Sequence, residues 1–363
     1  MTANPSPPQA LGEQLRQQQA ALAQGLVARQ FATQPELAQR YGPAGREKCL
    51  QDANYHLGFL ADAMDAGNPA LFANYIAWAK VMLGKRGIPA GDLARHLEFT
   101  RAVVGPALAG AAGVLAVEYL NAGLARLPSL PTELPTCLIA DAPQAELARA
   151  YLSALLKGER HIASRLVLDA VAAGVPVKEI YLHVFQTAQY EVGRLWQVNE
   201  ISVAQEHYCT AATQLIMSQL YPHVFASEKG AGTLVATCVA GDLHETGVRM
   251  VTDFFELDGW NTFYLGASMP GQSVVDTVVQ RHAQVLGISA TISSHLRAVG
   301  ELIAKVRADA RCQGVKILVG GYPFLVAPEL WRKLGADGSA PNAQAAITLA
   351  NQLVAGGGVH EPA

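Results

Sequence analysis

The sequence Gly241-Asp242-Leu243-His244-Glu245-Thr246-Gly247 follows directly after the apolar run 234–240 and decides the fold. A short apolar run that leads through such a loop into a helix is typical of open α/β sheets, which bind ligands at the carboxyl ends of their strands. Asp242 stands two residues before His244, so its carboxylate can accept one ring N–H and make the other nitrogen a better metal ligand. Because a His in such a loop can also be a helix cap or a solvated side chain, the interpretation depends on the residues downstream.

Small residues end the next apolar runs of the chain. Ser289-Ala290-Thr291 follows the run 285–288, and Gly320-Gly321 follows the run 315–319. Together with the His244 loop they resemble the cobalamin-binding domain of corrinoid-dependent methyltransferases and mutases. In that family, Asp-x-His-x-x-Gly, Ser-x-Leu and Gly-Gly elements have the same separations. Thr291 is the one departure, because the family has Leu there.

This resemblance implies a base-off cobalamin whose cobalt is bound by the protein. In the family, the dimethylbenzimidazole tail leaves cobalt and enters a slot beside the first strand, and His244 would take its place as the lower axial ligand. Glycine lets a backbone approach a flat ring closely, so small residues suit such a slot. The predicted cobalamin-contacting residues of this domain are Asp242, His244, Gly247, Ser289, Thr291, Gly320 and Gly321.

The composition fits a protein with several packed domains. A length of 363 residues suits two or three domains, and 50% hydrophobic residues provide material for their cores. The net charge of −3 gives no positive footprint for nucleic acid, and five scattered cysteines argue against a disulfide framework. Without a signal peptide or an uninterrupted apolar run of membrane-spanning length, the sequence predicts a cytoplasmic protein with no membrane or direct nucleic-acid partner.

The periodicity of apolar residues predicts a multidomain α and α/β fold. Helical spacing predicts an all-α domain and, after a linker with several prolines, a four-helix bundle with a capping box at Ser202 and Gln205. Short strands at 233–239, 261–264, 285–288 and 316–319 then alternate with helices, as in a Rossmann-like doubly wound parallel sheet. The predicted boundaries are a disordered tail 1–14, the all-α domain 15–127, the linker 128–144, the bundle 145–228, the sheet domain 229–355 and a tail 356–363.

The four-helix bundle resembles the cap that shields the upper face of a corrinoid. Trp196 is followed after nine residues by Glu206-His207, and this pattern resembles the B12-dependent photoreceptors related to light-sensing MerR-type repressors. The resemblance implies an adenosyl pocket formed by Trp196, Val203, Glu206 and His207. The family has a cobalt-ligating His directly after the Trp, whereas this chain has Gln197, which puts the family's photoproduct in doubt. Core packing of Trp196 with a surface acid is the alternative.

Polar groups share the inward stripe of the first predicted helix pair. At 100° per residue, Cys49, Asp52 and His56 fall on one side, and Tyr75 and Trp78 follow on the next helix. Beside a photoreceptor-like cobalamin module, this arrangement resembles the photocobilins, which bind biliverdin. The resemblance implies a bilin site that contains Cys49, Asp52, Tyr55, His56, Tyr75 and Trp78, with Cys49 as the candidate for covalent attachment. A hydrogen-bonded Asp52–His56 pair that stabilises the bundle is the alternative.

The sequence therefore predicts a light sensor rather than an enzyme. It would bind adenosylcobalamin with His244 on cobalt, sense light by Co–C photolysis and use biliverdin to extend absorption to the red. Output would pass through self-association or a partner protein. Two alternatives stay open, namely a corrinoid methyl carrier of a methyltransferase system and a regulator that senses cobalamin or haem without photochemistry, with His56 or His96 as haem ligand.

Overall fold

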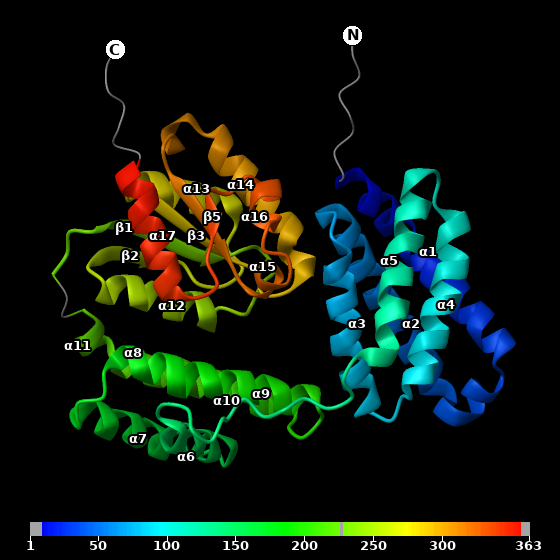
Figure 1. Ribbon diagram of the computed structural model, residues 1–363, viewed down its shortest axis with the longest axis horizontal. Helices are drawn as coiled ribbons and strands as arrows, with labels where there is room; N and C mark the ends of the chain where they lie inside the picture. Colours follow the sequence, from blue (N-terminus) through cyan, green and yellow to red (C-terminus); the bar gives the residue numbers. More distant parts are fainter. Residues whose placement is uncertain (1–8, 226–227, 357–363) are drawn as a thin grey trace, which may run out of the picture. The chain divides into compact units, whose positions relative to one another are not determined.

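The structure, a computed structural model, describes residues 9–225 and 228–356, and they form two compact units. The first unit is built mainly from residues up to Thr132, and the second mainly from residues from Glu133 onward. In Figure 1 the first unit is coloured blue to cyan and the second green to red. No helix within the described ranges has the length and apolar character needed to cross a membrane.

The first unit is all-helical, as predicted. Its helices are α1 (Gln9–Thr33), α2 (Glu36–Ala66), α3 (Pro69–Gly84), α4 (Ala90–Ala107) and α5 (Ala111–Arg126), followed by the 3-10 turn η1 (Leu127–Ser129). The two helices predicted at 36–40 and 46–64 form one kinked helix, with Gly42 at φ 64° before Pro43. A positive φ at a glycine and a proline inside the helix explain the kink.

The predicted disordered tail is wrong for residues 9–14, because α1 begins at Gln9. Its first turns are held by the first unit's core: the side chain of Leu15 is fully buried, and the backbone N–H of Gly12 donates to Asp65 Oδ1 at 2.9 Å. The ordered chain therefore begins earlier than its proline-rich start suggested. The remaining tail residues, 1–8, lie outside the described residues, as do 357–363 at the other end.

The helical half of the second unit follows a segment without helix or strand between Ser129 and Ala145. Four long helical stretches appear, as the sequence predicted, and the third contains a π-helical segment. Ser202 caps the last long helix and forms the predicted capping box with Gln205. The elements are α6 (Ala145–Leu156), α7 (Arg160–Ala172), α8 (Val177–Glu179), η2 (Ile180–Gln186), α9 (Thr187–Gln197), α10 (Val203–Gln219) and α11 (Tyr221–Val224), and we call them the cap.

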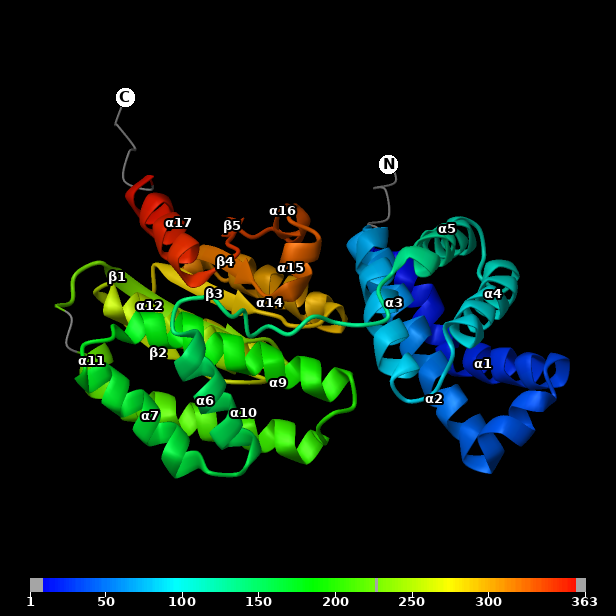
Figure 2. The same cartoon turned by 60° about the horizontal axis from the view of Figure 1, so that its bottom comes forward.

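The other half of the second unit is a parallel five-stranded sheet with the order β2-β1-β3-β4-β5, seen from a second direction in Figure 2. The four predicted strands are confirmed, and β5, only two residues long, is an addition that its length hid. The strands are β1 (Gly232–Cys238), β2 (Trp260–Tyr264), β3 (Val285–Ser289), β4 (Lys316–Gly320) and β5 (Gly338–Ser339).

Helices cover both faces of this sheet, so the doubly wound prediction is confirmed (Figure 1). The helix α12 lies on the face that meets the cap, and α17 packs beside it, whereas α13 and α14 lie on the opposite face. The bounds are α12 (Thr246–Leu257), α13 (Gly271–Gln280), η3 (Ser293–His295), α14 (Leu296–Ala308), η4 (Ala310–Cys312), α15 (Tyr322–Val326), α16 (Leu330–Leu334) and α17 (Ala343–Gly356).

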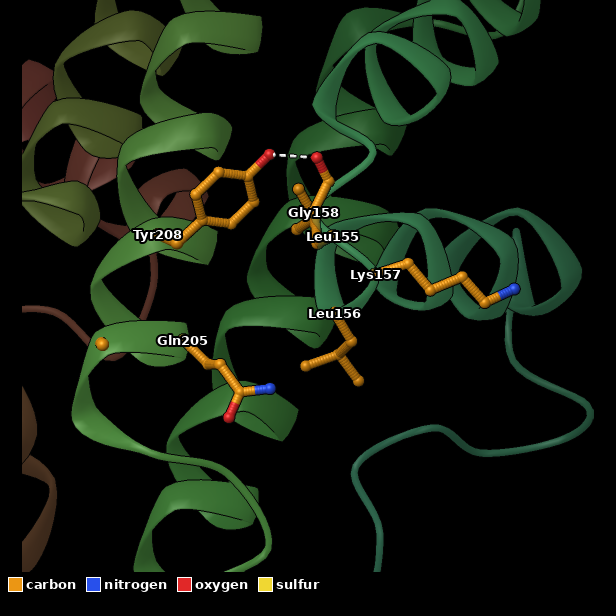
Figure 3. Close-up of a pocket in the computed structure, with 7 residues that line it drawn as sticks. Leu155, Leu156, Lys157, Gly158, Gln205 and Tyr208 are labelled. Carbon is orange, nitrogen blue, oxygen red and sulfur yellow. Dashed lines mark hydrogen bonds between the residues drawn. The ribbon is translucent and has the colours of Figure 1, made fainter.

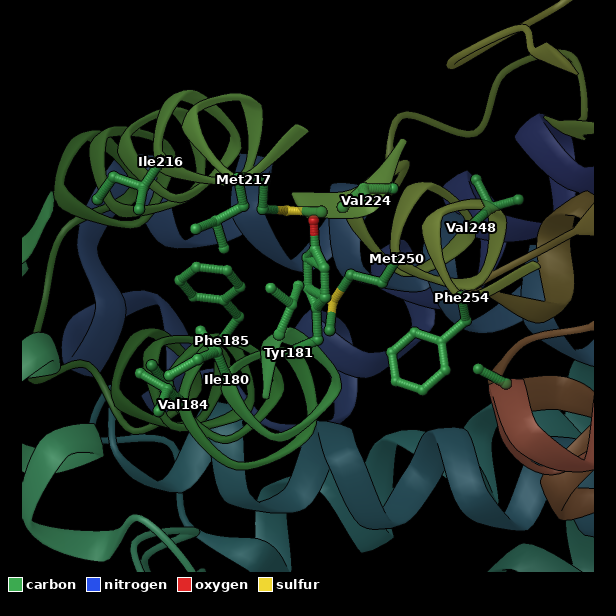
Figure 4. Close-up of a cluster of buried hydrophobic side chains, with 14 of the residues drawn as sticks. Ile180, Tyr181, Val184, Phe185, Ile216, Met217, Val224, Val248, Met250 and Phe254 are labelled. Atoms are coloured by element: carbon green, nitrogen blue, oxygen red, sulfur yellow. The ribbon is translucent and has the colours of Figure 1, made fainter. Parts of the chain in front are cut away.

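The cap and the sheet share one apolar core at the end where α11 meets α12. Figure 4 shows Tyr181 and Val224 from the cap beside Met250 and Phe254 from α12. Tyr181 is fully buried, and its hydroxyl donates to Asp253 Oδ2 at 2.9 Å. Each fully buried large apolar side chain stabilises the folded protein by roughly 1.5–3 kcal/mol, so this end anchors the cap to the sheet.

Candidate functional site

The loop after β1 holds His244 through a buried carboxylate. Asp242 has no exposed surface, and its Oδ1 accepts both the ring Nδ1–H of His244 at 2.8 Å and the backbone N–H of His244 at 3.0 Å. The other oxygen, Oδ2, accepts the backbone N–H of Thr291 at 2.7 Å. One carboxylate therefore fixes the imidazole and ties the loops after β1 and β3 together.

The hydrogen bonds decide which nitrogen of His244 can bind a metal. A carboxylate only accepts hydrogen bonds, so Nδ1 carries the proton and the lone pair lies on Nε2. The hydrogen bond that His244 donates to Asp242 raises the pKa of His244, with smaller contributions from the charges of Asp242 and Glu206. The side chain of His244 is 58% exposed. A basic, accessible Nε2 is the chemistry that an axial ligand needs.

His244 stands at the topological switch point of the sheet. The chain leaves β1 to form β2 on one side and returns to form β3 on the other, so the loops after β1 and β3 diverge. Such a divergence opens the crevice in which open α/β sheets bind ligands. The predicted residues His244, Ser289 and Thr291 are therefore brought together, because they follow these two strands.

A row of small residues runs across the carboxyl ends of the strands. Cys238 in β1 is level with Ser289 in β3, which is level with Gly320 in β4. A Cβ built on Gly320 would meet no atom within 4 Å. Gly320 therefore borders open space next to Ser289, where a flat heterocyclic tail can pass. Gly247, on the first turn of α12, likewise borders open space.

Gly321 has a different role from the one predicted. Its φ is 108°, and a Cβ there would collide with the carbonyl oxygen of Ala290. Gly320 therefore leaves room at the site, whereas Gly321 lets two loops come into contact. Thr291 likewise reaches the site by its backbone N–H, which explains why the Leu of the family pattern can be replaced.

These residues fit a base-off cobalamin. In a corrinoid the macrocycle supplies four ligands to cobalt, so the protein needs to supply one. Within the described part of the chain, no group of three or more His, Cys, Asp or Glu side chains could hold a bare metal ion. Large apolar side chains also stand exposed beside His244 and on α15, which follows Gly321 directly, namely Leu243, Tyr322 and Leu325. A macrocycle bound beside His244 and α15 would cover them.

The residues of the cap that were predicted to lie over the upper face differ in their exposure. Glu206 is half-buried and accepts a hydrogen bond from Thr210 Oγ1 at 3.1 Å. Its charge also contributes to the raised pKa of His244. Trp196 is half-buried. Val203 is exposed, and the His207 side chain is 75% exposed, with Nε2 3.3 Å from the carboxylate of Glu206. The role of these residues in an adenosyl pocket stays a prediction.

A cavity of about 310 Å³ lies elsewhere in the cap, between the end of α6 and the start of α10. Leu155 and Gly158 line it opposite Tyr208, whose hydroxyl donates to the Gly158 carbonyl at 2.6 Å (Figure 3). None of the predicted cobalamin-binding residues lines this cavity. It is therefore a feature of helix packing in the cap rather than part of the site.

In the first unit, the residues predicted to hold a bilin lie mostly together. Tyr75 stacks on Phe59 with ring centroids 3.8 Å apart and lies 6.1 Å from Trp78. Asp52 is half-buried, and Cys49 points to Gln30, with Sγ 3.8 Å from Oε1. Tyr55, by contrast, is exposed. The bilin role of these residues stays a prediction.

The structure does not support the alternative of an Asp52–His56 hydrogen bond, because His56 Nδ1 bonds the Tyr75 hydroxyl at 2.8 Å instead. The ring of His56 also meets the ring of His96 at 5.1 Å, edge to face. His96 Nδ1 bonds Gln30 Oε1 at 2.8 Å, and its buried Nε2 has no hydrogen-bond partner among the described residues. Sequence spacing could not show that two histidines 40 positions apart would meet.

Burial of His96 predicts a loss of stability in acid. Burial lowers the pKa of His96 to about 4, below the value near 6.5 of an unfolded chain. The stabilising contribution is complete above about pH 6.5 and falls as the pH drops toward 4, by about 2 kcal/mol between pH 7 and pH 5. Hydrogen exchange of α2 to α4 in the full chain should show this loss. His96→Gln should reduce it but not abolish it, because burial also lowers the pKa of the neighbouring His56. The exposed-residue control His207→Gln should behave like the parent, and an equal loss in His96→Gln would contradict the assignment.

Two family matches cover the second unit. A family described as B12 binding domain matches residues 232–348, and another with the same description matches residues 147–221. The first covers the sheet with its loops and the second covers the cap. The chain therefore combines a helical N-terminal region with a cap and a parallel-sheet B12-binding domain.

Individual relatives agree with these matches. The chain is 28% identical over 193 residues to dimethylamine corrinoid protein 3 of Methanosarcina acetivorans, covering 52% of this chain and 89% of that protein. It is 31% identical over 129 residues to dimethylamine corrinoid protein 1 of Methanosarcina mazei, covering 35% of this chain and 58% of that protein. The solved monomethylamine corrinoid protein of Methanosarcina barkeri matches with a TM-score of 0.52 and 25% identity, over 58% of this chain and 99% of that one.

These findings support a cobalamin-binding protein and overturn the predicted light sensor. The relatives are named corrinoid proteins, and nearly the whole of the first one aligns with this chain. The cap therefore does not by itself distinguish a photoreceptor, and the Trp-x9-Glu-His pattern depended on only three side chains, one of them largely solvent-exposed. Cobalamin is supported as cofactor, whereas neither its adenosyl form nor biliverdin is.

Proposed function

We propose that the chain is the corrinoid protein of a methyltransferase system, which carries a methyl group and works with a partner methyltransferase. The observation that carries this proposal is the His244–Asp242–Thr291 arrangement at the switch point, in a unit that aligns with almost the full length of a dimethylamine corrinoid protein. When bound, cobalamin would supply a cobalt atom able to accept and release a methyl group. The methyl carrier was one of the alternatives that the sequence left open.

In this function each part of the site has a task that its geometry supports. His244 Nε2 would bind cobalt from below, while Asp242 holds the proton on Nδ1 and stabilises a more basic imidazole. Ser289 and Gly320 would border the tail. The cap helices α9 and α10, with Trp196 and Glu206, would exclude water from the upper face until the partner engages.

The proposal is tested with the full chain expressed anaerobically in the dark and supplied with cobalamin. The cofactor is extracted and its upper group identified by mass spectrometry, and dissociation constants are measured for methylcobalamin and adenosylcobalamin. We expect methylcobalamin to bind at least as tightly as adenosylcobalamin. The reduced, loaded protein should also take up a labelled methyl group from a methylated amine in the presence of a dimethylamine methyltransferase. A cofactor that is entirely adenosylated, together with no methyl uptake, would contradict the proposal.

A further inference from the structure

Glu245 lies where the His244 loop, the cap and the edge of the sheet meet. It follows His244 directly and precedes the first residue of α12. Its Oε1 accepts a hydrogen bond from Gln214 Nε2 of α10 at 3.2 Å, and its Oε2 accepts one from the Tyr264 hydroxyl at the end of β2 at 2.7 Å. One half-buried carboxylate therefore joins two elements that are far apart in sequence.

Two further contacts hold the chain around Glu245 in place. The backbone N–H of Glu245 donates to the Leu243 carbonyl at 2.9 Å, which closes a tight turn around His244. Gly266, at φ 85°, brings the segment after β2 so close that a Cβ there would lie 3.3 Å from Glu245 Oε2. The carboxylate is thus held from the sheet side, and its remaining partner is Gln214 of the cap.

The bond to Gln214 ends a row of polar contacts along α12. One turn further, Arg249 Nη2 donates to Ser218 Oγ at 2.7 Å and to the Tyr221 hydroxyl at 3.0 Å. Beyond Arg249, the contact between α12 and the cap is apolar and includes Tyr181 (Figure 4). Because hydrogen bonds at a half-exposed contact exchange with water at a net cost of only about 1 kcal/mol, the end at Gln214 separates more easily than the anchored end.

We propose that Glu245 is a positioning residue that links the His244 loop to the cap, so that a shift of the cap at Gln214 changes how His244 meets cobalt. This inference rests on the part of the proposed function that assigns His244 to cobalt, and it needs no particular chemistry at the upper face. A partner that displaced the cap would thereby alter the lower ligand as well. Gln214 Nε2 also donates to Thr246 Oγ1 at 3.4 Å, so the two faces of the cofactor site would be coupled where Gln214 contacts Glu245 and the residue after it.

The test uses the full chain loaded with cobalamin and three variants, Glu245→Ala, Gln214→Met and Tyr264→Phe. Two quantities are measured: the dissociation constant for cobalamin, and the nitrogen splitting that a bound imidazole gives in the electron paramagnetic resonance spectrum of the Co(II) state. For Glu245→Ala we expect affinity to fall by about tenfold, the lower end for an outer partner of a metal ligand, with a weakened nitrogen splitting. Gln214→Met and Tyr264→Phe should each show part of this effect, about threefold.

Matched controls remove the same groups elsewhere in the cap. Gln219→Met loses a hydrogen bond with Ser164, and Tyr208→Phe loses one with Gly158, so both should leave affinity and nitrogen splitting unchanged. In a His244→Ala background, Glu245→Ala should cause no further loss of affinity, because it acts through His244. Additive losses, or an undisturbed nitrogen splitting in Gln214→Met and Glu245→Ala, would overturn the proposal. Methyl uptake is not measured, so this result is independent of the proposed carrier function.

Discussion

Replacement of His244 by alanine is expected to lower the affinity for cobalamin by about 100-fold and to abolish the spectrum of imidazole-bound cobalt. Loss of an outer partner of a metal ligand costs about 10- to 100-fold, and loss of the ligand itself should reach the upper end of that range. The fold should persist, since the side chain is more than half exposed. Titration of the full chain with cobalamin, followed by absorption spectra, measures both effects.

A variant of Asp242 distinguishes loss of the cobalt ligand from disturbance of the loop that holds it. Asp242→Asn keeps the shape of the side chain but offers one acceptor oxygen, whereas Asp242 accepts three hydrogen bonds. It should give a milder loss of affinity than His244→Ala, together with lower stability of the loop. His161→Ala, at an exposed position of the cap, should change neither quantity. If His244→Ala bound cobalamin with unchanged spectrum and affinity, the assignment of the lower ligand would be wrong.

The strands and the site at their ends were predictable from the sequence because both depend on local patterns. β-branched runs ended by small residues fixed β1, β3 and β4, and parallel pairing then brought His244, Ser289 and Gly320 to one edge. The capping box at Ser202 was equally local. Such features need only the chain's own periodicity and turn chemistry.

Contacts between distant residues could not be predicted in this way. Nothing in the sequence pairs Glu245 with Gln214 and Tyr264, or His56 with Tyr75 and His96, because these contacts depend on how helices pack. Gly320 and Gly321 looked equivalent, yet only one has a positive φ and a backbone neighbour. The sequence signal for Glu245 was its position next to His244 at the start of a helix. Acidic residues are common at helix starts because they interact favourably with the helix dipole, so this signal was not specific.

The predicted function was wrong for the same reason, because it depended on contacts between residues that are far apart in the sequence. Cobalamin binding was predicted from motifs on three strand ends, and the comparisons support a cobalamin-binding protein. The light-sensing interpretation depended on Trp196, Glu206 and His207, whose placement over an upper face requires the tertiary arrangement of the cap. A short pattern on two helices can serve several chemistries, so it could not decide between a photochemical sensor and a methyl carrier.

Replacement of Gly321 by alanine is expected to destabilise the sheet, whereas the same change at Gly320 should spare the fold and weaken cobalamin binding. At Gly321 the φ of 108° is strained for any residue with a Cβ, and that Cβ would collide with the Ala290 carbonyl. Strain of this kind costs up to about 3 kcal/mol, which corresponds to hydrogen exchange roughly 100-fold faster in β3 and β4.

At Gly320 a Cβ would enter open space, so the apo protein should keep the exchange rates of the parent. If the cobalamin tail passes this position, the added methyl group overpacks the slot, and affinity should fall by about tenfold. Hydrogen exchange of the apo proteins and cobalamin titration of both variants provide the measurements. Equal exchange rates in the two variants would contradict the assigned backbone role of Gly321. Unchanged affinity in Gly320→Ala would place the tail elsewhere, because a slot that tolerates an extra methyl group at its wall cannot be closely packed against a planar ring.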